Sequence, residues 1–441
     1  MKYLAKEDPQ IAKFINEEEK RQEEVLEMIA SENYTSKAVM EALGSVLTNK
    51  YSEGYPGRRY YQGNEVADKV EQTAIDRAKE LFGVPFANVQ ALSGSVMNVA
   101  AYVAVQSLSD HKIKLMGLEL ASGGHLTHGQ PQSMTSRFFD ATLYKIKLDG
   151  TFDFNAIEKQ AMEEKPDVLI CGFTAYPRTI DFERFAQIAD KVGAYLLADI
   201  SHIAGLVAGG AHPSPVKFAH IVTTTTHKTL RGPRGALIMV TDKGLAKNAD
   251  LGKKVDWAII PGLQGGPHDN QTAGIAVALR EAATPEFKKY AAQIVKNSKA
   301  LAQRLTALGF DLVSGGTDNH LILIDLRNKG VSGAILAPAL EVAGIVTNMN
   351  GVPGDTMPPM FPSGLRIGTA ALTTRGMKEK DMEKVADWMN KVVEEVSQVS
   401  LPEEKRKVFI DAFKVEVASN PKLLAIAGEV KTFTKKFPVH S

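Results

Sequence analysis

Cysteine is nearly absent from this chain of 441 residues, which contains only Cys171. One thiol cannot form an internal disulfide, and it cannot supply the several cysteine ligands of a zinc or iron–sulfur centre. No pair of histidines has the spacing and helical setting of a known zinc site either. We therefore predict no catalytic metal, and a single cysteine fits a reducing compartment.

The sequence also lacks an excess of charge of either sign and long apolar runs. Lys and Arg number 52 against 51 Asp and Glu, which gives a formal net charge of +1. Such a chain has no positive field to hold the phosphates of nucleic acid or an anionic membrane surface. No uncharged apolar run reaches the roughly 18 residues of a membrane span, and the N-terminal MKYLAKEDPQ does not resemble a secretory signal. We expect a cytoplasmic protein without nucleic-acid or membrane partners.

What the chain contains is a regular alternation of helical and strand-like segments. Residues 16–30 place apolar side chains at helical spacing, which predicts an N-terminal helical arm. From residue 65 onward, helices are expected at 65–82, 153–164 and 181–192, and apolar strands at 114–118, 167–172, 194–199, 220–224 and 236–240. This alternation predicts an α/β fold with a mostly parallel sheet covered by helices.

The rhythm changes near residues 285–290. A long helix is expected at 286–308, a strand at 320–326, another helix at 332–343 and a helix-rich end from residue 379. We interpret this part as a second, smaller α+β domain. The predicted division is an arm at 1–50, a large α/β domain at 51–288 and a small C-terminal domain at 289–441.

Two strand ends carry unusual polar residues. The segment VTTTTHKTLRGPRG at 222–235 places Lys228 just after an apolar strand, where dry surroundings would favour the neutral amine needed for a Schiff base. The alternative is an ordinary surface lysine. The segment AYLLADISHIAG at 194–205 ends its strand in Asp199, and a buried carboxylate needs a cationic or donor partner. A protonated pyridine nitrogen could be that partner of Asp199.

A third segment supplies a candidate anion cradle. Ser93, Gly94 and Ser95 open an apolar helical stretch, where backbone N–H groups and hydroxyls can face a phosphate. By itself this is an ordinary helix N-cap. Together with Lys228 and Asp199, it completes the lysine, acid and phosphate cradle that pyridoxal phosphate chemistry requires.

These segments resemble the serine hydroxymethyltransferase family of fold-type I pyridoxal phosphate enzymes. The resemblance rests on IASENYTS (29–36), NKYSEGYPGRRYYQG (49–63), GGHLTHG (123–129), TAYPR (174–178), GLQGGP (262–267), SGGTDNHL (314–321) and SGLRIGT (363–369). It implies an aspartate aminotransferase-like α/β fold, with a mostly parallel seven-stranded sheet in the large domain. It also implies reversible one-carbon transfer between serine and tetrahydrofolate, giving glycine and 5,10-methylenetetrahydrofolate.

The resemblance assigns the cofactor contacts by position. It implies that Lys228 forms the aldimine with pyridoxal 5'-phosphate, that Asp199 faces the pyridine nitrogen and that His125 stacks on the ring. Thr174 and His202 match residues near the phenolic oxygen of the cofactor. The remaining implied contacts are to the phosphate, from Ser93, Gly94 and Ser95 and, on a neighbouring subunit, from Tyr51, Gly265 and Gly266.

The substrate contacts are implied in the same way. Arg366 matches the arginine that takes the amino-acid carboxylate, with Ser31 assisting, and its planar fork suits bidentate pairing. Glu53 matches the acid/base group, Tyr61 lies beside the substrate, and both join Lys228 and His202 in the implied catalytic set. The implied folate contacts are Leu120, Gly123, Gly124 and the region of Asn348 and Asn350, in which Asn350 is the residue expected to contact the folate. A site shared between subunits implies an obligate homodimer or a tetramer.

The chain departs from the family pattern at a few positions. Apolar residues surround the phosphate segment at Ala91, Leu92, Val96 and Met97, and Met349 stands where a lysine is common. Two alternatives keep the cofactor and change the reaction: a folate-independent aldolase or transaldolase, and an α-methylserine hydroxymethyltransferase. A more remote alternative is a non-catalytic binding protein of the same fold.

Overall fold

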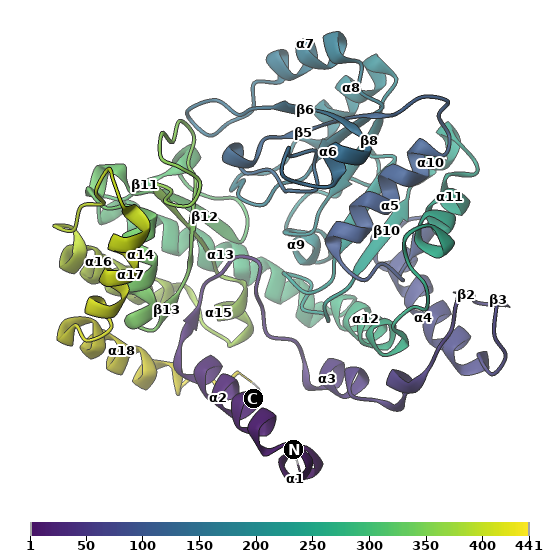
Figure 1. Cartoon of the computed structure of the whole chain (residues 1–441). Helices are drawn as coiled ribbons and strands as arrows, with labels where there is room; N and C mark the ends of the chain where they lie inside the picture. Colours follow the sequence, from purple (N-terminus) through teal and green to yellow (C-terminus); the bar gives the residue numbers. More distant parts are fainter. Residues whose placement is uncertain (1, 440–441) are drawn as a thin grey trace. The chain divides into compact units, whose positions relative to one another are not determined.

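The computed structural model describes residues 2–439, which form two compact units (Figure 1). The described part of unit 1 comprises residues 2–34, 296–316 and 321–439, and unit 2 comprises residues 35–295 and 317–320. Residues 1 and 440–441, which the predicted domain ranges include, lie outside the described residues. Helix α13 (Pro285–Ala307) contributes residues to both units.

Unit 2 is built on a seven-stranded sheet in the order β4–β10–β9–β8–β7–β5–β6. β10 alone runs opposite to the other six strands of this sheet, so the predicted mostly parallel α/β sheet is confirmed. Every residue of β7, β9 and β10 is buried, as expected for strands covered on both faces. The strands are β4 (Phe86–Asn88), β5 (Lys114–Leu118), β6 (Asp140–Tyr144), β7 (Val168–Cys171), β8 (Tyr195–Asp199), β9 (Ile221–Thr225) and β10 (Ala236–Val240).

Helices with local start and stop signals cover this sheet. Asp181 caps the N-terminus of α8 through its side chain, and Gly193 ends the same helix in the left-handed conformation. Helix α5 packs its apolar residues on β9 and β10. The helices of unit 2 are α3 (Lys37–Leu43), α4 (Glu65–Phe82), α5 (Gly94–Gln106), α6 (Thr135–Phe138), α7 (Phe154–Glu164), α8 (Phe182–Val192), α9 (Ala204–Ala208), α10 (Asp242–Lys247), α11 (Leu251–Trp257) and α12 (Asp269–Ala282).

Shorter elements of unit 2 lie in the loops that carry candidate site residues. A two-stranded ribbon pairs β2 (Gly54–Tyr55) with β3 (Arg58–Arg59). Three short helical turns are η1 (Val46–Asn49), η2 (Leu120–Ser122) and η3 (Ala258–Leu263).

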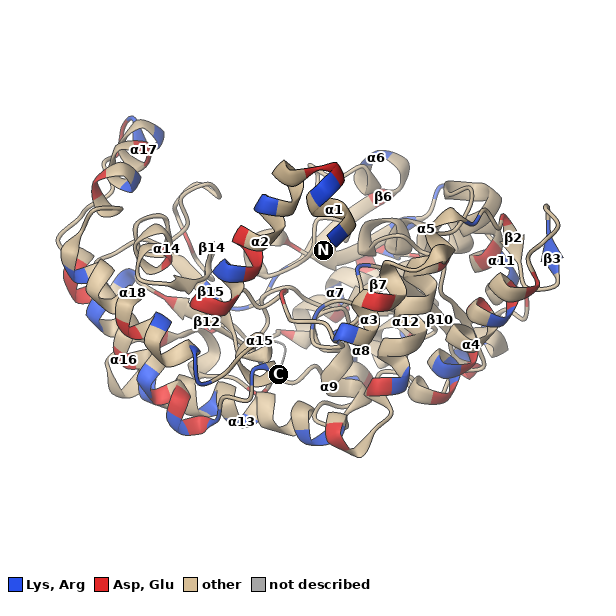
Figure 2. Ribbon diagram, turned by 90° about the horizontal axis from the view of Figure 1, so that it is seen from below, with Lys and Arg blue, Asp and Glu red and all other residues tan. Residues whose placement is uncertain are grey.

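Unit 1 contains a four-stranded antiparallel sheet in the order β11–β12–β15–β14 and a helical layer. Its apolar core includes the fully buried Trp388, and Figure 2 shows acidic and basic residues interspersed along α16. The strands are β11 (Asp311–Leu312), β12 (Leu321–Asp325), β14 (Asn348–Asn350) and β15 (Gly364–Gly368). The helices and turns of unit 1 that follow α13 are η4 (Val313–Gly315), η5 (Arg327–Lys329), α14 (Gly333–Val342), α15 (Ala370–Thr374), α16 (Glu379–Val396), α17 (Arg406–Val417) and α18 (Pro421–Thr434).

The N-terminal arm differs from its prediction. After α1 (Lys2–Glu7), helix α2 (Pro9–Glu24) ends six residues before the predicted limit of 30. The chain then forms β1 (Leu26–Glu27), which pairs in parallel with β13 (Ile345–Val346). The prediction of a helix up to residue 30 is wrong because Leu26 and Met28 are fully buried in the core of unit 1. Tertiary packing and pairing outweigh the helical spacing of the local sequence.

Candidate active site

Asp199 ends β8 as a buried carboxylate with several hydrogen-bond donors. Its Oδ1 accepts from the backbone N–H of Ser201 at 3.0 Å and from the Ser201 hydroxyl at 2.6 Å. Its Oδ2 lies 2.9 Å from Nδ2 of Asn98 and 3.1 Å from Nε2 of His128. Burial by itself would raise the pKa of Asp199, but these donors together hold that pKa well below its usual range. The carboxylate is therefore ionised at neutral pH.

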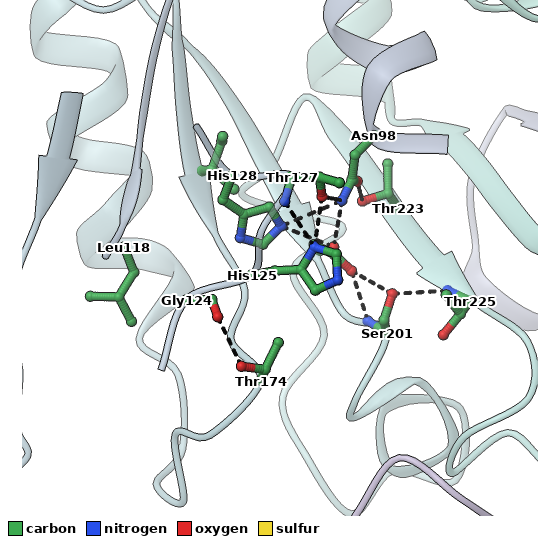
Figure 3. Close-up of polar contacts among 12 residues, drawn as sticks. Asn98, Leu118, Gly124, His125, Thr127, His128, Thr174, Ser201, Thr223 and Thr225 are labelled. Atoms are coloured by element: carbon green, nitrogen blue, oxygen red, sulfur yellow. Dashed lines mark hydrogen bonds and ion pairs between the residues drawn. The ribbon is translucent and has the colours of Figure 1, made fainter. Parts of the chain in front are cut away.

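A polar network around Asn98 extends from this carboxylate into the pocket (Figure 3). Asn98 lies on α5, is buried, and its Nδ2 also donates to Oγ1 of Thr127 at 2.9 Å. Its Oδ1 accepts from the hydroxyl of Thr223 on β9 at 3.1 Å. Thr127 Oγ1 lies 2.7 Å from Nδ1 of His125. The amide of Asn98 thus connects the carboxylate of β8 with the histidine expected to face the cofactor ring.

The pocket gathers six of the residues predicted from the sequence. Asp199 and Lys228 line it together, although Asp199 ends β8 and Lys228 follows β9. Burial lowers the pKa of His125 to about 4, with further contributions from His128 and Lys228, so its imidazole is neutral at pH 7. The predicted residues that line the pocket are Gly94, His125, Thr174, Asp199, His202 and Lys228; Asn98, His128, Phe173, Ser201 and Thr225 join them.

The loop after β9 holds Lys228 in a fixed turn. The backbone N–H of Arg231 donates to the carbonyl of Lys228 at 3.0 Å, and the N–H of Gly232 donates to the carbonyl of Thr226 at 2.7 Å. The Arg231 guanidinium lies over the Tyr290 ring, 4.5 Å from its centroid. Thr229 accepts from the N–H of Gly205 and donates to the carbonyl of His202, which connects this loop to the segment after β8.

One end of the pocket has the features of an anion cradle. Ser93 caps α5, and its Oγ accepts from the N–H of Val96 at 3.4 Å. A Cβ added to Gly94 would lie 2.7 Å from Cγ2 of Thr225, so only glycine fits beside that strand. Thr225 Oγ1 is buried and has no hydrogen-bond partner among the described residues. A phosphate at the N-terminus of α5 would supply the missing acceptor, and the residues present therefore fit the implied cofactor.

Thr174 joins the pocket to the predicted folate loop. Its Oγ1 donates to the carbonyl of Gly124 at 2.9 Å and to that of Gly123 at 3.1 Å. Gly123 ends the short turn η2 with a φ of 97°, a conformation that favours glycine. Leu120, at the start of this turn, is 41% exposed.

A second cluster in unit 2 contains other predicted residues outside the pocket lining. The hydroxyl of Tyr51 donates to Oε1 of Glu53 at 2.9 Å, and the Tyr51 and Tyr61 rings meet edge to face at 5.3 Å. A Cβ at Gly266 would lie 2.9 Å from the Tyr51 ring, and one at Gly265 would lie 3.0 Å from Glu53 Oε1. The structure thus brings together Tyr51, Glu53, Tyr61, Gly265 and Gly266.

A buried ionic network braces the loop of this second cluster. Arg59 donates to Asp68 and Glu71 at 2.7 Å each and to the carbonyls of Ser52 and Gly54. The Ser52 hydroxyl lies 2.8 Å from both carboxylate oxygens of Asp269. Burial raises the pKa of Glu71 despite the attraction of Arg59.

The predicted carboxylate-binding residues belong to unit 1. Arg366 lies on β15, where its Nε donates to Oδ1 of Asn348 at 3.1 Å, and burial lowers its pKa to about 10. The guanidinium remains charged at pH 7. Ser31 is half-buried, and Asn350 donates from Nδ2 to the carbonyl of Gly351. Alternation along β14 directs Met349 to the opposite face from Asn348, so the methionine faces away from Arg366.

Several site residues were not singled out from the sequence. Asn98 is a polar residue within the buried apolar helix MNVAAYVAV, a setting that requires a hydrogen-bond partner. Ser201 stands two residues after Asp199, a spacing typical of side-chain capping of a turn. His128 is buried against Asp199, and nothing local in the sequence distinguishes it from a core histidine. Ala91 and Met97 lie in the core cluster beside α5, and Val96 packs against it.

The described residues offer neither a metal-binding cluster nor a membrane-spanning helix. Within residues 2–439, no group of three or more His, Cys, Asp or Glu side chains is placed to hold a metal ion. None of the helices described there has the length and apolar character needed to cross a bilayer.

Comparison with known proteins places these features in a family. The family model for serine hydroxymethyltransferase matches residues 4–389. A serine hydroxymethyltransferase of Acidothermus cellulolyticus is 51% identical over 436 residues, which cover 99% of this chain and 96% of that protein. One of Desulfotalea psychrophila is 52% identical over 393 residues, covering 89% of this chain and 90% of that protein. One of Marinomonas sp. is 50% identical over 439 residues, covering 99% and 97%. The chain belongs to the serine hydroxymethyltransferase family, as its motifs predicted.

Proposed function

We propose that this chain transfers the hydroxymethyl group of serine reversibly to tetrahydrofolate, giving glycine and 5,10-methylenetetrahydrofolate, with pyridoxal 5'-phosphate as cofactor. Its family is one of transferase enzymes. The observation that carries the proposal is the ionised carboxylate of Asp199 in the pocket that Lys228 also lines. A buried anion and an amine in one small pocket are the two groups that this cofactor requires from the protein.

The residues of the pocket divide the work of holding the cofactor. The amine of Lys228 would bind its aldehyde carbon covalently, and Asp199 would keep a proton on its ring nitrogen. Neutral His125 offers an uncharged flat face to the ring. Ser93, Gly94, Ser95 and the unsatisfied Thr225 hydroxyl would hold the phosphate. When bound, the cofactor supplies an electron sink for the bond that breaks at Cα of the substrate.

The amino-acid carboxylate would pair with Arg366, assisted by Ser31. Arg366 is suited to this task because it stays charged while buried, and the bond from its Nε to Asn348 fixes the plane of the guanidinium. A fixed fork orients the substrate, which lowers the entropic cost of reaching the reactive geometry.

Proton transfer at the hydroxymethyl carbon would fall to Glu53, with Tyr61 beside the substrate and His202 close to the cofactor. The hydrogen bond from Tyr51 holds the Glu53 carboxylate in one orientation. Leu120, Gly123, Gly124 and Asn350 would contact the folate, and the bonds from Thr174 fix the two glycines.

A homodimer or tetramer would complete the site. Tyr51, Gly265 and Gly266 would reach the phosphate of a neighbouring subunit. The exposed aromatic side chains Tyr51, Tyr60, Tyr61 and Trp257 support an interface here, because tyrosine and tryptophan are enriched at protein interfaces. We also propose a cytoplasmic location and the three-part division at residues 50 and 288.

The test is a direct assay of the purified protein loaded with pyridoxal phosphate. Glycine and methylenetetrahydrofolate should form from serine only when tetrahydrofolate is present. Cleavage of serine or threonine at a rate that does not depend on folate would favour an aldolase or transaldolase. A preference for α-methylserine as substrate would favour an α-methylserine hydroxymethyltransferase. Cofactor binding without turnover would favour a non-catalytic binding protein. The Lys228→Ala variant should lose turnover while the exposed Lys112→Ala variant keeps it.

A further inference from the structure

His202, which lines the pocket, contacts a second buried histidine that does not line it. Nδ1 of His202 lies 3.4 Å from Nε2 of His320, and the two ring planes are inclined by 28° with their centroids 5.6 Å apart. His202 is 5% exposed and His320 is fully buried. The two imidazoles meet away from bulk water, where a hydrogen bond between them is stronger than in solvent.

His320 is held in place by the segment 317–320, which we call the strap. The strap binds the loop after β7, where the Asp318 N–H donates to the carbonyl of Pro177 at 2.8 Å. Asp318 also pairs with Arg178 at 3.1 Å. Asn319 donates from Nδ2 to the carbonyl of Tyr176 at 3.0 Å. These bonds fix the backbone on which His320 stands.

On the other side, the backbone of His202 is fixed as well. Its carbonyl accepts from the hydroxyl of Thr229, the residue after Lys228, at 3.0 Å. With both backbones fixed, the two rings have little freedom to separate. One proton must lie between the two nitrogens for a hydrogen bond to form, so each ring sets the tautomer of the other.

The pocket determines which ring donates. Thr174 and His202 are the residues expected beside the phenolic oxygen of the cofactor, an acceptor. The Thr174 hydroxyl already donates to the carbonyls of Gly123 and Gly124. His202 must then supply the donor, and because its Nδ1 faces His320, the donor is Nε2–H. In this tautomer Nδ1 has no proton, so it must accept a hydrogen bond from Nε2–H of His320.

We infer that His320 is a positioning residue that donates from Nε2 to Nδ1 of His202 and thereby keeps His202 as the Nε2–H tautomer facing the cofactor. The inference rests on the proposed function for the identity of the acceptor. The contact between the two histidines does not depend on it. His320 thus acts on the reaction through His202, without touching the cofactor itself.

The test compares two substitutions of His320 with a matched control. His320→Phe keeps a flat ring and removes the donor, whereas His320→Gln keeps an N–H donor. His220→Phe removes another buried histidine, whose Nδ1 accepts from the N–H of Leu196 at the start of β8. Deuterated protein labelled with ¹⁵N-histidine, with and without pyridoxal phosphate, reports which ring nitrogen of His202 is protonated.

We expect Nε2–H in the unsubstituted protein, loss of that preference in His320→Phe and its recovery in His320→Gln. In the loaded enzyme, kcat for serine should fall about tenfold in His320→Phe with KM within about twofold, and His320→Gln should restore most of it. His220→Phe should change thermal stability and leave the His202 signals unchanged.

An unchanged His202 tautomer in His320→Phe would overturn the inference. Equal losses of kcat in the Phe and Gln variants, following a common loss of thermal stability, would also overturn it by assigning a structural role. Because the nitrogen signals are read without substrate, failure of the proposed function would appear separately, as absent turnover with the tautomer pattern intact.

Discussion

Nδ2 of Asn98 lies 2.9 Å from Oδ2 of Asp199, although the two residues are 101 positions apart in the chain. The same amide nitrogen reaches Thr127, and its oxygen accepts from Thr223. A neutral residue with both a donor and an acceptor is needed here, because it must stabilise a carboxylate while satisfying a threonine hydroxyl.

Replacing Asn98 with aspartate should weaken cofactor binding. The Asn98→Asp side chain keeps its size but places a second negative charge against Asp199, which raises the pKa of one of the two carboxyls. We expect the Kd for pyridoxal phosphate to rise at least about tenfold and the free energy of unfolding to fall by about 2–4 kcal/mol. Titration calorimetry of the apoenzyme and urea unfolding measure these effects. Asn155→Asp, on an exposed position of α7, is the control, and unchanged affinity in Asn98→Asp would contradict the role given to Asn98.

Substitution of Glu53 should slow hydroxymethyl transfer to folate without weakening the binding of pyridoxal phosphate. In Glu53→Gln the side chain can still accept from Tyr51 but cannot take up a proton, so folate-dependent serine cleavage should fall at least about hundredfold. The Kd for pyridoxal phosphate should stay within about twofold. Tyr51→Phe removes the hydroxyl that orients Glu53 and leaves the Glu53 carboxyl in place, so it should give a smaller loss in the transfer assay than Glu53→Gln. Equal losses of cofactor affinity and transfer in Glu53→Gln would argue for a structural role.

Arg366→Lys should raise the KM for serine while preserving positive charge. A lysine ammonium cannot form the two parallel hydrogen bonds of a guanidinium, and it loses the bond to Asn348. We expect KM to increase by about tenfold or more, measured by steady-state serine cleavage. Arg304→Lys, in the partly exposed pair with Asp387, is the matched control. If both variants gave the same KM, Arg366 would not be the carboxylate receptor.

Glu27 should make stability depend on pH near neutrality. Burial, followed by the nearby Glu32, raises the pKa of the buried Glu27 carboxyl to about 7, above the 4.5 of the unfolded chain. Between these values the folded state binds more protons, so the free energy of unfolding falls as pH rises from 4.5 to 7 and then levels off. Glu27→Gln removes this dependence.

The free energy of unfolding of Glu27→Gln, relative to that of the unsubstituted protein, should therefore increase by about 1–3 kcal/mol between pH 5 and pH 8. Urea unfolding at several pH values measures it. Glu19→Gln, on the exposed surface of α2, is the control, and its free energy of unfolding should differ from that of the unsubstituted protein by an amount that does not change with pH. If the difference in the free energy of unfolding were also independent of pH for Glu27→Gln, Glu27 would have an ordinary pKa in the folded protein.

Local patterns in the sequence were enough to locate five strands of the seven-stranded sheet (β5, β7, β8, β9 and β10) and three helices of unit 2 (α4, α7 and α8). The strand predicted at 236–240 and the helix predicted at 65–82 have the observed limits, because a short apolar run and an amphipathic helix with a closing glycine are determined by nearby residues. The arm was different. Helical spacing continued through residue 30, yet Leu26 and Glu27 pair with β13, more than 300 residues later. Patterns of neighbouring residues cannot identify a strand partner so far away in the sequence.

The sequence by itself determined the alternation of strands and helices, the chemical groups available for catalysis and the family, since motifs such as TTTTHKTLRGPRG require no folding to be recognised. Only the tertiary structure decided which of these groups meet. Parallel strands bring Asp199 and the loop of Lys228 to one edge of the sheet, and α5 brings Asn98 against Asp199. Contacts such as Asn98 to Asp199 and His202 to His320 depend on distances between segments far apart in the chain, which hydrophobic burial and strand pairing fix.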